Sequence, residues 1–203
     1  MITKTISISN GNSKMGEIPS VSLPPIVTCK HSETCGKTGQ CYVLKLLRFR
    51  TKMRDAYNRN YEILMENRDS YFAQIKAAAI TSRFFRFHVS GDIVDIDYLD
   101  RMVKLARELK ETRFLVFTKN YEDVNEYFKS HKKPKNLQIV MSLPFNGEGI
   151  DNPHNFPTAA IILKGDTPKD TWKICGGNCS ECACRGVGCW ELKKGETIAF
   201  HEH

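Results

Sequence analysis

Apolar positions in the middle of the chain alternate between two patterns. Short runs rich in Val, Ile, Leu and Phe are separated by segments of about ten residues with helical periodicity, which is typical of a parallel sheet. The predicted strands cover residues 83–89, 113–118, 137–142 and 159–163, and the predicted helices between them cover 98–109 and 121–130. We therefore predict an α/β fold, either a partial (β/α) barrel or an open, mostly parallel sheet with cysteine-rich loops.

The two central helices carry the signals expected of helices that cover a sheet. The first has an apolar stripe at i, i+3, i+4 and i+7 spacing, and Asp95 or Asp97 is available as its N-cap. Asn120, followed three residues later by Asp123, resembles a capping arrangement for the second. The stripe of the first helix consists of Leu99, Met102, Val103, Ala106 and Leu109.

The first 81 residues divide into two parts. Residues 1–28 mix Thr, Ser, Ile, Gly and Pro, which predicts one or two short strands with turns. Residues 42–81 lack Gly and Pro and predict two helices, with Asn60 or Asp69 as the cap of the second. The first of these is strongly basic, which indicates either a solvated face or a surface for phosphates; its cations include Arg48, Arg50, Lys52, Arg54 and Arg59.

Composition narrows the class of protein. The chain has 203 residues, 41% of them hydrophobic, which excludes a disordered or fibrous chain and predicts a single domain over residues 1–203. The formal charge of +7 favours a polyanionic partner without requiring one. No run approaches the roughly 20 apolar residues of a membrane span, and residues 1–10 have no secretory pattern. We therefore expect a soluble cytoplasmic protein with no membrane partner, in the host cytoplasm if it is phage-encoded.

Eight cysteines fall into two groups, in residues 29–41 and 175–189, on either side of the βα core at 83–163. Because the cytosol keeps thiols reduced, clustered cysteines are better explained as metal ligands than as disulfides. Cys184 is the expected spare thiol, and His154, His201 and His203 are possible replacement ligands. The predicted metal ligands are Cys29, Cys35, Cys41, Cys175, Cys179, Cys182 and Cys189.

Ligation by thiolates alone suits either an iron-sulfur cluster or tetrahedral zinc, and the spacing does not choose between them. The four C-terminal ligands would complete one cluster, which leaves three N-terminal thiols to hold another with an open iron. Cys41 also precedes a predicted helix, where unpaired backbone N–H groups favour a thiolate. We favour [4Fe-4S] and keep zinc as the alternative.

Polar residues follow the predicted strands at their carboxyl ends. In parallel α/β folds these ends meet at one edge, where reactive groups gather. We predict Asp92 and Lys119 as catalytic residues, whereas a turn or cap is the simpler account of Asn120 and of Ser142 taken singly. His88 lies inside its predicted strand, and a role as a hydrogen-bonded core residue explains it at least as well as a role as a ligand. The predicted cofactor-binding residues are Ser90, Gly91, Thr118 and Ser142.

The order of these motifs resembles the phage "gene product 88" family. The resemblance is carried by Cys35 to Cys41 with Tyr42, by residues 87–92 (FHVSGD), by residues 117–119 (FTK) and by the cysteine cluster ending in Cys189-Trp190. More distantly, the chain resembles a reduced radical S-adenosylmethionine barrel, whose three-cysteine loop holds a [4Fe-4S] cluster. That resemblance implies Cys29, Cys35 and Cys41 as its ligands and S-adenosylmethionine as a possible cofactor. The gaps here are five and five residues, whereas that superfamily has three and two, the gaps found at residues 175–182.

Three hypotheses follow. The first is a phage-encoded iron-sulfur protein, radical-enzyme-like, acting on an unknown substrate. The second is a non-catalytic protein in which zinc staples both cysteine groups and the basic helix, with Arg83, Arg86 and Arg185, contacts nucleic acid. The third is an oxygen sensor or host-factor binder that keeps a cluster without its chemistry.

Overall fold

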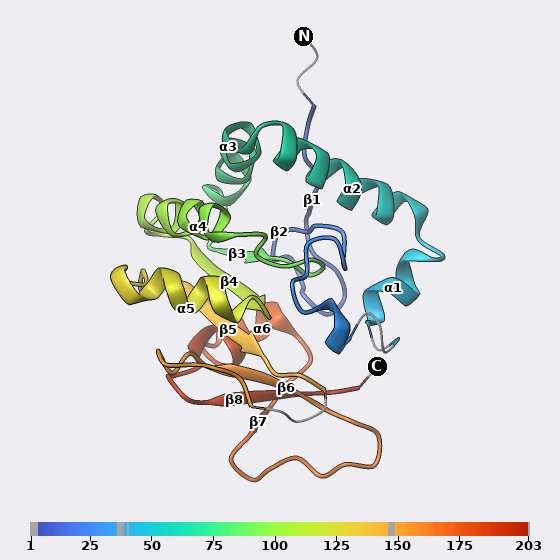
Figure 1. Cartoon of the computed structure of the whole chain (residues 1–203), viewed down its shortest axis with the longest axis vertical. Coiled ribbons are helices and arrows are strands. Elements are labelled where there is room, and N and C mark those ends of the chain that lie inside the picture. The colour runs from blue at the N-terminus through green and yellow to red at the C-terminus, as the bar shows by residue number, and fades with distance from the viewer. Residues whose placement is uncertain (1–3, 36–38, 40, 146–148, 203) are drawn as a thin grey trace.

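An open sheet organises the computed structural model, which describes residues 4–35, 39, 41–145 and 149–202. In this part of the chain the sheet has eight strands in the order β1-β2-β3-β4-β5-β6-β8-β7, and β1 alone runs antiparallel to its neighbour (Figure 1). The prediction of an open, mostly parallel sheet is confirmed, and the sheet does not close into a barrel. The strands are β1 (Ile8–Ser9), β2 (Ser20–Val21), β3 (Phe84–Phe87), β4 (Arg113–Thr118), β5 (Leu137–Ser142), β6 (Thr158–Ile162), β7 (Lys173–Ile174) and β8 (Thr197–His201).

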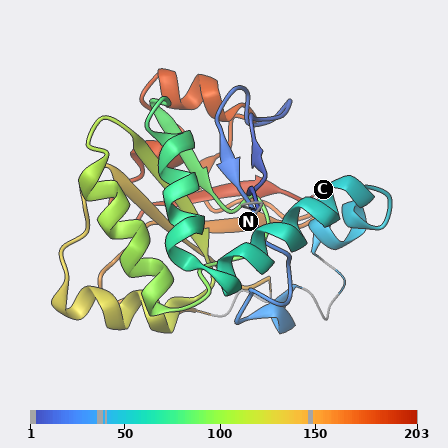
Figure 2. The same ribbon diagram turned by 90° about the horizontal axis from the view of Figure 1, so that it is seen from above.

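Helices lie on both faces of this sheet. Figure 2 shows α4 and α5 on one side and α6 on the other. None of the helices within the described ranges is long and apolar enough to cross a membrane. The α-helices are α1 (Tyr42–Leu47), α2 (Thr51–Glu66), α3 (Arg68–Ala79), α4 (Ile96–Glu108), α5 (Tyr121–Ser130) and α6 (Cys179–Cys184), with short 3-10 helices at Ser32–Thr34 and Gly188–Glu191.

The central βα units match the predicted pattern closely. Strands β4 and β5 and helix α5 have the predicted bounds. The Asp95 side chain caps α4 by accepting a hydrogen bond from Tyr98 N, and Asn120 caps α5 by accepting one from Asp123 N. The strand predicted over residues 83–89 is shorter, because β3 ends at Phe87 and His88 adopts a left-handed φ of 57°.

The helical region before the sheet differs from the prediction. It contains three helices instead of two, and Asn67, in extended conformation, caps α3 by accepting a hydrogen bond from Ser70 N. Neither predicted cap is correct. Asn60 is a fully buried residue of α2 that holds the N-terminal strands, donating to the carbonyl oxygens of Ser7 and Ser22 at 2.9 Å each, whereas Asp69 lies in the first turn of α3.

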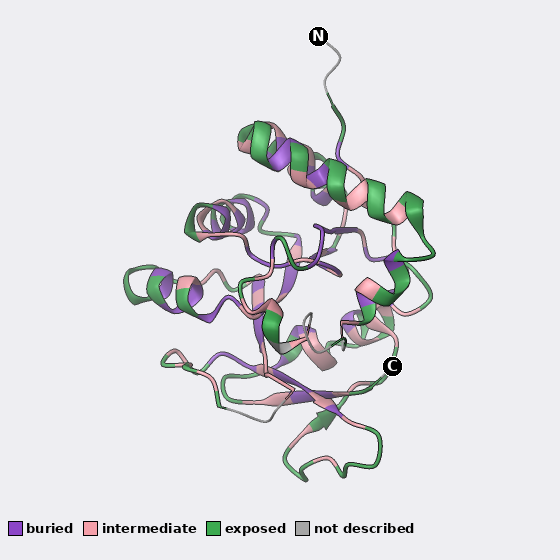
Figure 3. Ribbon diagram, turned by 45° about the vertical axis from the view of Figure 1, so that its right-hand side comes forward, coloured by how far each residue is buried: buried purple, intermediate pink, exposed green. Residues whose placement is uncertain are grey.

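The alternation of side chains along the strands separates two cores. On one face, Phe85, Phe87, Phe114 and Val116 pack with α3, α4 and α5. On the other face, residues one position along each strand pack with the segment around α6 and with Trp190. In Figure 3 the buried residues of α4 and α5 lie on the side of each helix toward the sheet, and the exposed residues lie on the side away from it.

Candidate functional site

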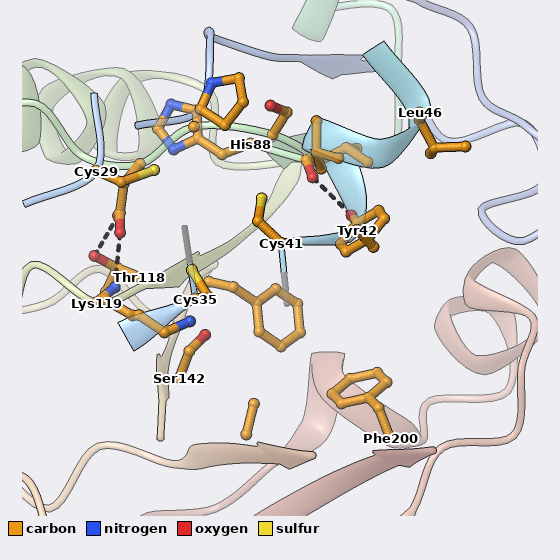
Figure 4. Close-up of a pocket in the computed structure, with 18 of the residues that line it drawn as sticks. Cys29, Cys35, Cys41, Tyr42, Leu46, His88, Thr118, Lys119, Ser142 and Phe200 are labelled. Atoms are coloured by element: carbon orange, nitrogen blue, oxygen red, sulfur yellow. Dashed lines mark hydrogen bonds between the residues drawn. The ribbon is translucent and has the colours of Figure 1, made fainter. Parts of the chain in front are cut away.

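A pocket at the carboxyl edge of the sheet brings together three groups of residues that are far apart in the sequence. Its volume is about 500 Å³, within the range of small-molecule sites. The cysteine loop, the loop after β3 and the ends of β4 and β5 all line it (Figure 4). The predicted site residues that line the pocket are Cys29, Cys35, Cys41, Ser90, Gly91, Asp92, Thr118, Lys119 and Ser142.

The three N-terminal thiols influence one another. Cys35 donates a hydrogen bond to the sulfur of Cys41, which raises the pKa of Cys35 and, together with the nearby backbone N–H groups of Val43 and Leu44, lowers the pKa of Cys41 to about 6. Burial raises the pKa of Cys29 to about 11. Cys41 therefore favours the thiolate, the form in which a cysteine binds a metal. The helix it caps has only six residues, whereas the sequence predicts a long one.

Lys119 provides a positive charge common to all three thiols. Its ammonium lowers the pKa of Cys29, Cys35 and Cys41, although other effects outweigh it at the first two. Figure 4 shows the Lys119 side chain extending toward Ser142 at the pocket. An anionic group bound here would gain from this charge.

Asp92 is held by the protein on both of its carboxylate oxygens. Oδ1 accepts hydrogen bonds from the Thr118 hydroxyl (2.6 Å) and the Ile93 N–H (2.7 Å), and Oδ2 accepts one from the Lys119 N–H (2.8 Å). Asp92 is buried, with 5% of the residue exposed, and burial raises the pKa of its carboxyl despite these donors. Asp92 thus ties the loop after β3 to the end of β4 and fixes the backbone from which Lys119 projects.

The predicted cofactor-binding residues differ in whether their side chains are already hydrogen-bonded within the protein. The Ser90 hydroxyl donates to Leu23 O at 2.9 Å, and the Thr118 hydroxyl is engaged by Asp92, so both support the pocket wall. Gly91 has φ 82°, and a Cβ there would lie 2.7 Å from Leu23 Cβ. The Ser142 hydroxyl faces the pocket, and its carbonyl accepts a hydrogen bond from Tyr121.

The second cysteine group lies on the α6 face of the sheet. Cys175, Cys179 and Cys189 pack against the core that contains Trp190. Burial, together with the nearby thiols of Cys175, Cys179 and Cys182, raises the pKa of Cys189 to about 12. Cys184, on the same helix as Cys182, is exposed.

Arg86 lies between the two cysteine groups. It projects from β3, lines the pocket and lies over the Phe117 ring at 4.8 Å. Its charge also lowers the pKa of both Cys179 and Cys189. Only the second of the three sequence hypotheses gave Arg86 a role, as a contact to nucleic acid phosphates. Its position in a strand, on the face opposite Phe85 and Phe87, was the signal that it faces the other core.

Other pocket residues were also missed. The hydroxyl of Tyr42 donates to Val89 O at 2.9 Å, and Phe200 lines the pocket from β8, a strand absent from the sequence prediction. Tyr42 was notable only for following Cys41. The short apolar run of residues 198–200 was the one available signal for β8.

The histidines considered in the sequence analysis lie in different parts of the structure. His88 is a buried pocket-wall residue hydrogen-bonded to the Tyr98 hydroxyl at 3.0 Å, and burial lowers its pKa to about 3. His154 contacts Asn125 O at 2.9 Å, and His201 is an exposed residue of β8. The suggestion for His203 lies outside the described residues. In the part of the chain that the structure describes, no three His, Cys, Asp or Glu side chains are arranged to hold a metal ion as they stand.

Fold and site together define an open α/β protein with a cysteine-lined pocket at the carboxyl edge of its sheet. The chain belongs to the gene product 88 family of phage proteins, since the family model described as "Gene product 88" matches residues 2–196. No curated protein and no solved structure is detectably similar to it. The predicted family is confirmed, whereas the more distant relationship to radical S-adenosylmethionine barrels stays a prediction.

Proposed function

We propose that this protein is an iron-sulfur protein whose N-terminal cysteines hold a [4Fe-4S] cluster at a pocket for S-adenosylmethionine or a similar small molecule. The observation that carries the proposal is that Cys29, Cys35 and Cys41 line the same cavity as Lys119 and the strand-end residues. Thiolates are the usual ligands of such clusters, and three of them leave one iron open. The four neighbouring thiols of the second group would hold another cluster.

The donor chemistry fits the proposed group, but the thiols must converge on loading. Lys119 favours the thiolate at each of the three N-terminal cysteines, and Cys41 already favours it. Within the described residues, no three ligands are arranged around a common centre. The pocket cysteines lie in loops and at a helix end, outside the sheet, so their rearrangement leaves the core intact.

The chain's own residues have distinct roles in this proposal. When bound, the cluster supplies single electrons. Lys119 contacts the ligand and stabilises negative charge on it, while Asp92 is a positioning residue that holds the Lys119 backbone through Oδ2. Phe117 and Phe200 exclude water from the inner end of the pocket.

Metal and sulfide analysis of protein purified without oxygen tests the proposal. We expect iron with matching acid-labile sulfide and broad visible absorbance. Cys41→Ala and Cys182→Ala should each lose part of the iron, whereas Cys184→Ala, the matched control, should lose none. Zinc without sulfide would overturn the cluster assignment and make both cysteine groups structural staples.

Ligand binding is tested separately on iron-loaded protein. S-adenosylmethionine should raise the midpoint of thermal unfolding of the wild type, because a ligand that binds only the folded state stabilises it. Lys119→Met should reduce this shift without loss of iron. An identical shift in both proteins would remove Lys119 from the binding site.

A further inference from the structure

A basic surface borders the pocket. It is formed by residues 42–59, comprising α1, the following turn and the start of α2, which we name the basic arm. The arm contains six cations and a single carboxylate, Asp55. Its cations are all exposed and comprise Lys45, Arg48, Arg50, Lys52, Arg54 and Arg59.

Cations of the arm lack the acidic partners that neutralise cations elsewhere. On the helices over the other face, Arg68 pairs with Asp95 and Asp97, and Lys104 pairs with Asp100. Within the described ranges, the arm has one ion pair, a 3.9 Å contact between adjacent residues on α2. A dense, unneutralised positive patch attracts polyanions and releases their counterions on binding.

An aromatic ring projects from the middle of the patch. Phe49 lies between Arg48 and Arg50 in the turn from α1 to α2, and 87% of its surface is exposed. Leu46 and Tyr42, nearby on α1, are also exposed. Exposed aromatic rings among cations are the platforms on which proteins stack the unpaired bases of single strands. Duplexes bury their base faces, so the ring favours a single strand.

The arm continues into the pocket. Tyr42, Leu46, Arg50, Met53 and Tyr57 form one of its walls. Arg86, which lies over the Phe117 ring, lines the same cavity. Cations and aromatic rings are therefore present both on the exposed arm and in the cavity that it borders, and the combination suits a phosphate with an attached planar base.

We propose that the basic arm binds single-stranded nucleic acid and presents one nucleotide of it to the pocket. The inference rests on the proposed function only for the pocket's chemistry and names its substrate class. Strand binding itself requires no cluster, so the two can fail independently.

Fluorescence anisotropy with a labelled single-stranded oligonucleotide of about 20 nucleotides tests the proposal over a range of salt concentrations. The arm variant Lys45→Gln/Arg48→Gln/Lys52→Gln should bind more weakly. Its plot of log affinity against log salt should flatten by about 2, because each phosphate that is no longer neutralised accounts for about 0.7 of the slope. The matched control removes three paired lysines over the other face: Lys76→Gln/Lys104→Gln/Lys129→Gln. The control should bind as the wild type does.

Phe49→Ala tests the stacking contact. It should weaken binding about 5- to 150-fold, the range that corresponds to one stacked base, with the salt slope unchanged. Any one of three results would overturn the proposal: the wild type does not bind the single strand at low salt, the arm variant and the control lose the same affinity, or a duplex of the same length binds more tightly than the single strand. Iron analysis of the same preparations, purified without oxygen, separates the two proposals. Strand binding by wild type that contains no iron would support this inference, while the missing iron would overturn the proposed function.

Discussion

The hydrogen bond from Thr118 to Asp92 should contribute far more to stability than a similar bond elsewhere in the core. Thr118 donates to a buried carboxylate at 2.6 Å and accepts from the Asn120 N–H at 2.9 Å. Thr118→Val keeps the shape and removes both bonds. A hydrogen bond to a charged group is worth about 1.5–3 kcal/mol, and a buried N–H without a partner costs about 1–3 kcal/mol. We expect a loss of about 3 kcal/mol or more in the free energy of unfolding.

Thr112→Val is the matched control. Thr112 is equally buried, but its hydroxyl donates to the neutral carbonyl of Ala79 at 3.0 Å, and that carbonyl also accepts from the Ser82 N–H. Its removal should cost about 1 kcal/mol. Urea unfolding of preparations with equal metal content resolves a difference of about 2 kcal/mol, since it shifts the midpoint by about 1 M at a typical slope.

The effect of Thr118→Val should also depend on pH. Burial raises the pKa of Asp92 above 3.8, so the folded protein holds this proton more tightly than the unfolded chain does. The contribution of Asp92 to stability is therefore greatest below pH 3.8 and falls as the pH rises through the folded pKa. Thr118 opposes this loss by stabilising the ionised form. Its removal should cost more at pH 7 than at pH 4, while Thr112→Val costs the same at both. Equal costs for the two variants, or a flat pH dependence for Thr118→Val, would refute the reasoning.

Two further substitutions test the structure around the pocket and the arm. Gly91→Ala places a Cβ 2.7 Å from Leu23 in a left-handed conformation and should lower the unfolding free energy by about 2–4 kcal/mol in urea. Gly177→Ala, with φ 88° and open space, should lower it by only about 1–2 kcal/mol, and equal losses would contradict the predicted clash. Asn60→Leu leaves buried backbone groups of the N-terminal strands without partners and should cost about 3 kcal/mol by thermal unfolding. Exposed Asn58→Leu should cost almost nothing, and similar melting of both variants would show that these bonds are not stabilising.

The regular core could be predicted because its signals are local. The apolar runs of β4 and β5 and the capped helix α5 need no distant partner to be recognised, and their bounds were predicted to the residue. The break between α1 and α2 has no such signal, since Leu47 to Thr51 contain neither Gly nor Pro. Strand β8 has only five residues and acquires its identity by pairing with β6. Both the break between α1 and α2 and the formation of β8 therefore depend on tertiary contacts.

The candidate site also has some features that could be predicted from the sequence and others that depend on tertiary structure. Polar residues after parallel strands must meet at one edge, so the approach of Asp92 and Lys119 followed from topology alone. The carboxylate of Asp92 accepts a hydrogen bond from the backbone N–H of Lys119 and not from the ammonium of the Lys119 side chain. This choice depends on the conformation of the loop, which the periodicity of the sequence does not reveal. The place of Arg86 between two cysteine groups required knowing which face of β3 meets α6.

The position of β8 has a consequence for how the protein is made. β8 lies between β6 and β7, yet residues 197–201 are synthesised after the other seven strands of the described sheet. Until then the edge of β6 has no partner at residues 158–162 and is open to pairing with another chain. The backbone N–H of Cys175 also bonds to Ala199 O, so the second cysteine group is not fully positioned before that moment. A chain truncated before residue 197 should therefore associate with other copies through this edge and hold the second cysteine group less firmly.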